Sequence, residues 1–106
     1  MSPKQLKVIN HKAIDIVSKH IIEQNDVYML RKLRNIEAYL QRQLDLNPDI
    51  SYSDLLNSIE FSRYISELWK PASFTGWYNF DLSVEDKKLI DDYQDIIREI
   101  SRNMIR

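Results

Sequence analysis

The two histidines are the side chains of this sequence with the widest choice of chemistry, because imidazole binds metals and transfers protons near neutral pH. His11 lies four residues before Asp15 and His20 lies three before Glu23, so each pair would share a helix face. Two ligands do not complete a metal site, and the repeated Glu and Glu-x-x-His sets of di-metal helical proteins are missing. We therefore expect no metal and no cofactor, and we interpret both histidines as partly exposed.

Other routes to catalysis are weaker still. The chain has no cysteine, and its one glycine, Gly76, does not form the clustered glycines of a phosphate-binding loop. A serine stripe with spacing of four has no neighbouring base, so it predicts a close helix crossing or simple exposure; it consists of Ser58, Ser62 and Ser66. We expect no catalytic residue, and a hydrolase or nuclease built on His11 or His20 ranks third among the functional interpretations.

Aromatic rings are concentrated in the stretch SFTGWYNF, residues 73 to 80. Four of the eleven aromatic residues of the chain lie there, namely Phe74, Trp77, Tyr78 and Phe80. They could fold over an open end of the protein and bury apolar area, with Trp69 joining them. Alternatively, Trp77 and Tyr78 could face outward as anchors of a protein interface. Both interpretations remain open, and the second gives a candidate partner-binding site.

A second candidate site is acidic. Asp91, Asp95 and Glu99 follow one another at intervals of four, with Asp92 alongside, so a helix would stack like charges on one face. One interpretation is an ordinary solvated face, partly neutralised by the nearby basic residues Lys87, Lys88, Arg98 and Arg102. The other is a docking strip for a toxin or enzyme with a basic surface.

Charge is unevenly distributed along the chain, although the net charge is only −1. Residues 1–46 hold eight basic and five acidic residues, whereas residues 47–106 hold seven and eleven. The basic residues of the first half suggest an alternative function in nucleic-acid binding; they are Lys4, Lys7, Lys12, Arg31, Lys32, Arg34 and Arg42, with His11 among them. An excess of three positive charges is small for that function, so nucleic acid is the less favoured partner.

Four amphipathic segments must position these residues. Ser2 and Gln5 fit a capping box, and the helix they start should end near residues 24–25. A second helix should run from a cap at Asp26 to about residue 47, and a third, capped at Ser51, should stop before Pro71. The last should begin after Ser83. Apolar residues recur at intervals of three and four along each segment, which predicts that Leu6, Leu33, Ile59 and Ile97 face the core.

These segments predict an all-α fold, specifically an antiparallel four-helix bundle with an aromatic-rich connection, residues 70–82, between the third and fourth helices. The length predicts one domain, residues 1–106. No apolar run approaches the length that spans a bilayer, so we expect a cytoplasmic protein. Fourteen isoleucines and seven asparagines suggest an AT-rich coding genome, such as that of a low-GC bacterium, a phage or a plasmid.

A small helical protein without an active-site constellation is most consistent with a non-enzymatic protein-interaction module. An inhibitor, an immunity protein, an antitoxin or an adaptor would fit, binding through residues 70–82 and the acidic face of the last helix. In size and organisation the chain resembles the four-helix immunity proteins of bacteriocin producers, a resemblance of architecture with no residue motif to carry over. Homodimer formation stays open.

Overall fold

The computed structural model describes residues 1–20, 24–68 and 82–103, and these residues form helices and turns without any strand. The prediction of an all-α protein is therefore confirmed. The helices are α1 (Pro3–Lys19), α2 (Gln24–Leu46), α3 (Tyr52–Leu56), α4 (Ile59–Leu68) and α6 (Val84–Asn103). The finer prediction of a four-helix bundle with an aromatic connection stays a prediction, because residues 69–81 lie outside the described part.

Local capping explains where most of these helices begin. Ser2 and Gln5 form the predicted capping box, with the Ser2 hydroxyl accepting from Gln5 N at 3.1 Å and Gln5 Oε1 accepting from Ser2 N at 2.8 Å. Ser51 and Asp54 form the second predicted box. The Ser83 hydroxyl accepts from Asp86 N at 3.2 Å at the start of α6. Each serine satisfies a backbone N–H that has no partner within its helix.

Two predicted helix boundaries are wrong. α1 ends at Lys19 rather than near residues 24–25, because the backbone of His20 leaves the helical conformation and its N–H bonds to Val17 O at 3.1 Å. α2 begins at Gln24, so Asp26 lies inside the helix and is not its cap.

The third predicted helix is divided into α3 and α4. Asn57 and Ser58 interrupt it, and the Ser58 hydroxyl accepts from Phe61 N at 3.2 Å, which caps α4. Tyr39 of α2 donates a hydrogen bond to the same hydroxyl at 2.7 Å. Ser58 is therefore a helix cap and not the first member of a small-residue stripe. The break also explains why Ile59, predicted to lie in the core, is 89% exposed while Phe61 is buried.

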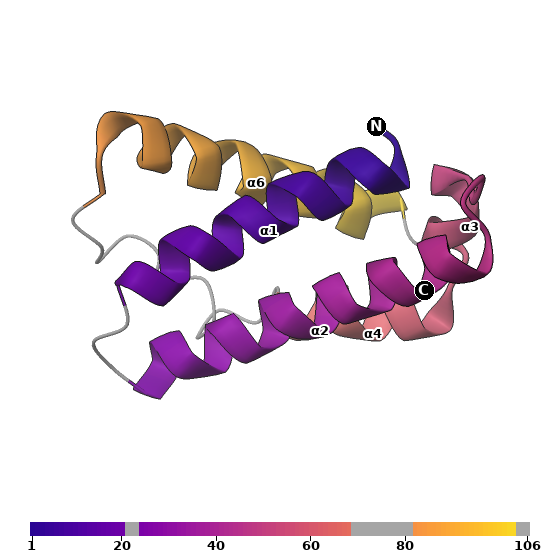
Figure 1. Ribbon diagram of the computed structural model, residues 1–106, viewed down its shortest axis with the longest axis horizontal. Coiled ribbons are helices and arrows are strands. Elements are labelled where there is room, and N and C mark those ends of the chain that lie inside the picture. The colour runs from indigo at the N-terminus through magenta and orange to yellow at the C-terminus, as the bar shows by residue number, and fades with distance from the viewer. Residues whose placement is uncertain (21–23, 69–81, 104–106) are drawn as a thin grey trace.

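The long helices surround one core. α1 packs against α2 and α6, and α4 packs against α2 and α6. In Figure 1, α1 and α4 run in one direction while α2 and α6 run in the other. The core contains aliphatic residues from every described helix, the ring of Tyr93, and the rings of Phe61 and Tyr39, which stack with centroids 5.5 Å apart. Its fully buried members include the predicted residues Leu6, Leu33 and Ile97.

A polar group lies within this core and joins three helices. Asn10 of α1 is fully buried, and its amide nitrogen donates to Leu33 O of α2 at 3.0 Å. Tyr93 of α6, also fully buried, donates its hydroxyl to Asn10 Oδ1. Burial raises the pKa of Tyr93, so the ring stays a neutral donor. We call Asn10, Leu33 and Tyr93 the buried polar link.

Candidate functional site

The acidic face of α6, which we define as Asp91, Asp95 and Glu99, lies on the solvent side of the helix. All three residues are exposed, whereas Ile90, Tyr93, Ile97 and Ile100 of the same helix are buried. The intervals of four place the three carboxylates on one side of the helix over about two turns. The structure therefore presents these predicted site residues to solvent together.

Neutralisation of this face by the neighbouring basic residues is limited. Asp95 Oδ1 lies 3.4 Å from Arg98 Nη1, and the side chains are 72% and 45% exposed. Neither Asp91 nor Glu99 forms an ion pair with a residue in the described ranges. An exposed pair such as Asp95–Arg98 contributes little to stability, so Asp95 can change partners at small cost.

The other half of the predicted partner-binding site is the aromatic stretch. Phe74, Trp77, Tyr78 and Phe80, together with Trp69, lie outside the described residues. Whether their rings cover the core or face a partner remains a prediction.

The histidines lie at different places on α1. His11 is exposed, and its Nδ1 lies 2.7 Å from Glu37 Oε1 of α2, while its Nε2 lies 3.8 Å from Asp15 Oδ2. The hydrogen bond to Glu37, followed by the charges of Glu37 and Asp15, raises the pKa of His11, and Lys7 partly opposes this. His20 ends α1. The sequence predicted the proximity of His11 and Asp15 but not that of Glu37, which depends on helix packing.

No group of three or more His, Asp or Glu side chains within the described ranges is arranged to hold a metal ion. His11 and its two carboxylates are an ion-paired cluster on the surface between α1 and α2. Its imidazole lies between the two acids, so they bind the ring and do not converge on a common point.

Two basic residues of α2 have acidic partners on α4. Lys32 Nζ lies 2.8 Å from Glu67 Oε2, and Arg42 Nη2 lies 2.6 Å from Glu60 Oε1. The hydrogen bond with Glu67 raises the pKa of Lys32, and the charge of Glu60 raises that of Arg42. These pairs remove positive charge from the surface that the nucleic-acid interpretation requires.

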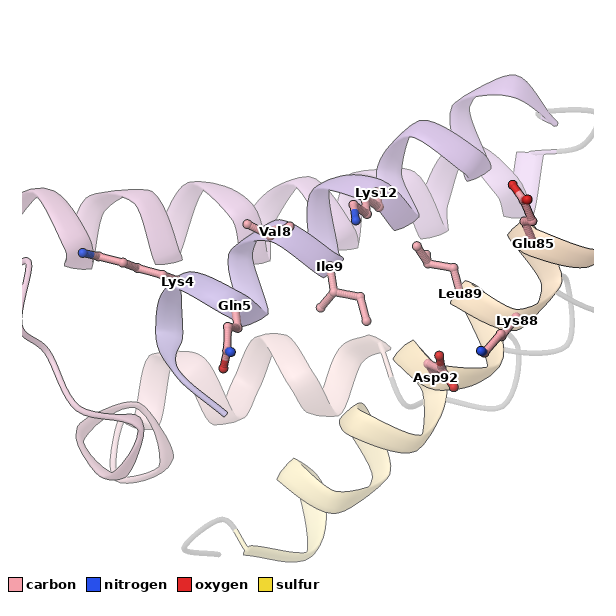
Figure 2. A pocket seen from close by; sticks show the side chains of 9 residues that line it. All are labelled: Lys4, Gln5, Val8, Ile9, Lys12, Glu85, Lys88, Leu89 and Asp92. Atoms are coloured by element: carbon pink, nitrogen blue, oxygen red, sulfur yellow. The ribbon is translucent and has the colours of Figure 1, made fainter.

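A groove that the sequence did not predict runs between α1 and α6. It has a volume of about 510 Å³; Ile9 and Leu89 point toward one another between the two helices, and Val8 of α1 also lines it (Figure 2). Charged side chains border it: Lys4 and Lys12 on α1, and Glu85, Lys88 and Asp92 on α6. Val8 is 56% exposed. In the sequence, the groove is indicated only by Val8, an apolar residue next to the core-facing positions of α1. A single exposed valine is common, so it predicts little.

Comparisons of the chain with protein-family models, with curated proteins and with solved structures find no match. No helix in the described ranges has the length and apolar character needed to cross a membrane.

Proposed function

We propose that this chain is a non-enzymatic protein-interaction module that binds a partner with a basic surface. An inhibitor, an immunity protein, an antitoxin or an adaptor would work in this way. The observation that carries the proposal is the exposure of Asp91, Asp95 and Glu99 on one side of α6, where Asp95–Arg98 is the one ion pair that these acids form with described residues. Grouped carboxylates raise the rate at which a basic partner is captured and set its orientation.

The proposed architecture is an antiparallel four-helix bundle in which α3 and α4 together occupy the third position. The connection of residues 70–82 would complete the partner-binding surface, with Trp77 and Tyr78 as anchors that supply apolar contact area. The packing of α1 and α4 against both α2 and α6 supports this architecture.

The nucleic-acid alternative uses the exposed residues Arg31 and Arg34, which form no ion pair with a described residue. It is less favoured because Lys32 and Arg42 of the same helix are paired with acids of α4. A filter-binding assay at low salt separates the two functions, because a chain that retains no nucleic acid there does not bind by phosphate neutralisation.

The test of the proposed function is an affinity capture from the native cells with D91K/D95K/E99K and the unmodified chain as baits. We expect the substituted chain to lose a partner that the unmodified chain retains, because like charges would now face one another. Replacing Trp77 and Tyr78 with Ala should abolish capture of the same partner.

The matched control is D15K/D45K/D49K, which changes the net charge equally but on exposed residues away from α6. It should retain the partner. Equal capture by both triple variants, with both folded as judged by circular dichroism, would contradict a role for the acidic face.

A further inference from the structure

The surface seams between helices differ in the side chains that line them. Across α1 and α2, Lys7 donates to Gln41 and His11 contacts Glu37, and the hollow of about 360 Å³ beside these contacts is lined mostly by polar and charged side chains. Across α2 and α4, Lys32 pairs with Glu67 and Arg42 with Glu60. The seam between α1 and α6 has the buried polar link beneath it, but at the surface it is the open groove of about 510 Å³ with apolar side chains in its lining. An apolar surface bordered by charged groups is typical of an interaction site.

The two edges of this groove carry charges that form no ion pair with one another. Lys4 and Lys12 form the edge on α1, and Glu85 and Asp92 are the acids of the edge on α6. None of these four forms an ion pair with a residue that the structure describes, although opposite charges lie on the two sides of one groove. Lys88 lies between the two acids on the α6 edge, so that edge is mixed but net negative.

The order of these charges is self-complementary. α1 and α6 run in opposite directions, so Lys12 lies toward the Glu85 end of the groove and Lys4 toward the Asp92 end (Figure 2). A twofold rotation about an axis parallel to the groove places the α1 edge of one copy opposite the α6 edge of the other. Lys12 then faces Glu85 of the second copy, Lys4 faces its Asp92, and each contact occurs twice.

We propose that the groove between α1 and α6 is the interface of a homodimer, with the α1 edge of each copy against the α6 edge of the other. Val8, an exposed residue of α1 that lines the groove, would be covered by the second copy. We favour a second copy as the occupant because one chain carries both the basic edge and the acidic edge that complement each other. The proposal uses Glu85 and Asp92 rather than the acidic face of α6, so it does not depend on the proposed function.

Sedimentation equilibrium at protein concentrations from about 10 µM to about 500 µM tests the association directly, because dimer formation depends on protomer concentration. We expect the unmodified chain to form dimers at low salt. K4E/K12E and E85K/D92K should each raise the dimer dissociation constant by about tenfold or more, because each places like charges on facing edges. An equimolar mixture of the two variants should regain association, as a heterodimer in which acids again face lysines.

Two further variants make the result specific to the proposed orientation. K88E makes the α6 edge wholly acidic, so it should tighten the dimer if that edge faces Lys4 and Lys12 of the second copy. It should weaken the dimer if α6 faces α6. R31E/R34E changes the charge as K4E/K12E does, but on exposed residues of α2, and should leave association unchanged.

Three results would overturn the proposal. If the unmodified chain stays monomeric throughout the concentration range at low salt, the groove is not a homodimer interface and would instead bind a segment of another protein. A mixture of the two charge-reversed variants that does not associate, while each remains folded, excludes the facing edges. A dimer weakened by K88E excludes the proposed orientation.

Discussion

At the residue scale, His11 makes the contact between α1 and α2 depend on protonation. The neighbouring carboxylates stabilise the imidazolium, so the pKa of His11 in the folded protein is raised above the ordinary value of 6.5. The contribution of this contact to stability is therefore fully present below that ordinary value and is lost as the pH rises through the higher pKa of the folded state. The contact stabilises the fold at mildly acidic pH and not in alkaline solution.

We predict that Glu37→Gln lowers the pKa of His11 more than Asp15→Asn does. Glu37 lies 2.7 Å from the ring and provides both a hydrogen bond and a charge, whereas Asp15 lies 3.8 Å away and acts through its charge. Titration of the His11 ring followed by NMR measures both variants against the unmodified chain. Equal shifts, or a larger shift for Asp15→Asn, would be inconsistent with the contact between α1 and α2.

At the element scale, the division between α3 and α4 depends on Ser58. Its hydroxyl accepts from the backbone of Phe61 and from Tyr39 of α2, so one oxygen both starts α4 and fixes it to α2. α4 in turn contributes Phe61, Ile65 and Leu68 to the core. The cap therefore sets which face of α4 is buried.

We predict that Ser58→Ala lowers the free energy of unfolding by about 1 kcal/mol, the usual cost of removing a helix N-cap. Ser66→Ala is the matched control, because Ser66 is an exposed residue inside α4 and the change should alter stability by less than about 0.5 kcal/mol. Urea denaturation of the two variants measures the difference. If both substitutions had the same effect, Ser58 would be an ordinary helix residue.

The sequence predicted those features of the elements that depend on neighbouring residues. Ser2 with Gln5 and Ser51 with Asp54 are recognisable because each box is complete within four residues. The cap at Ser58 was missed although its bond from Phe61 N spans only three residues, because position 61 has no acidic or amide side chain to complete a capping box. The hydrogen bond from Tyr39, 19 residues away, forms only on folding. In a continuous helix, Ile59 would lie on the same buried face as Leu55. Because the helix is interrupted at residues 57 and 58, α4 has a different rotational position, and Phe61 faces the core instead.

In the candidate site, too, local features were predictable from the sequence and features that depend on helix packing were not. Exposure of Asp91, Asp95 and Glu99 follows from their position opposite the apolar residues of α6, and it was predictable from spacing. Glu37 beside His11 was not, because it needs the register of α1 against α2. Nor was the groove, which depends on how Val8 and Leu89, from helices at opposite ends of the sequence, come together.

At the scale of the whole molecule, the buried polar link holds α1, α2 and α6 in one register. Asn10 and Tyr93 are both inaccessible to water, so a shift of either helix would leave polar atoms in the core without partners. Hydrophobic packing alone would tolerate such a shift more readily. The link therefore specifies one arrangement of these helices.

We predict that Tyr93→Phe lowers the free energy of unfolding by about 1–3 kcal/mol, because it removes the donor to a buried oxygen of Asn10. Tyr52→Phe, at a half-buried ring, should have a much smaller effect. Combining Tyr93→Phe with Asn10→Leu should cost less than the sum of the two single changes, since both groups disappear together. Urea denaturation gives all four values, and strict additivity would show that the two side chains do not interact.

The link also has a consequence for synthesis on the ribosome. Asn10 and Tyr93 are 83 positions apart, so the first helix is translated well before the phenol that completes its hydrogen bonding. At the usual elongation rate of about 5–20 residues per second, α1 and α2 are synthesised several seconds before Tyr93. During this interval the nascent chain carries an incompletely paired amide and an uncovered apolar face, and its final native register is fixed only after α6 has left the exit tunnel.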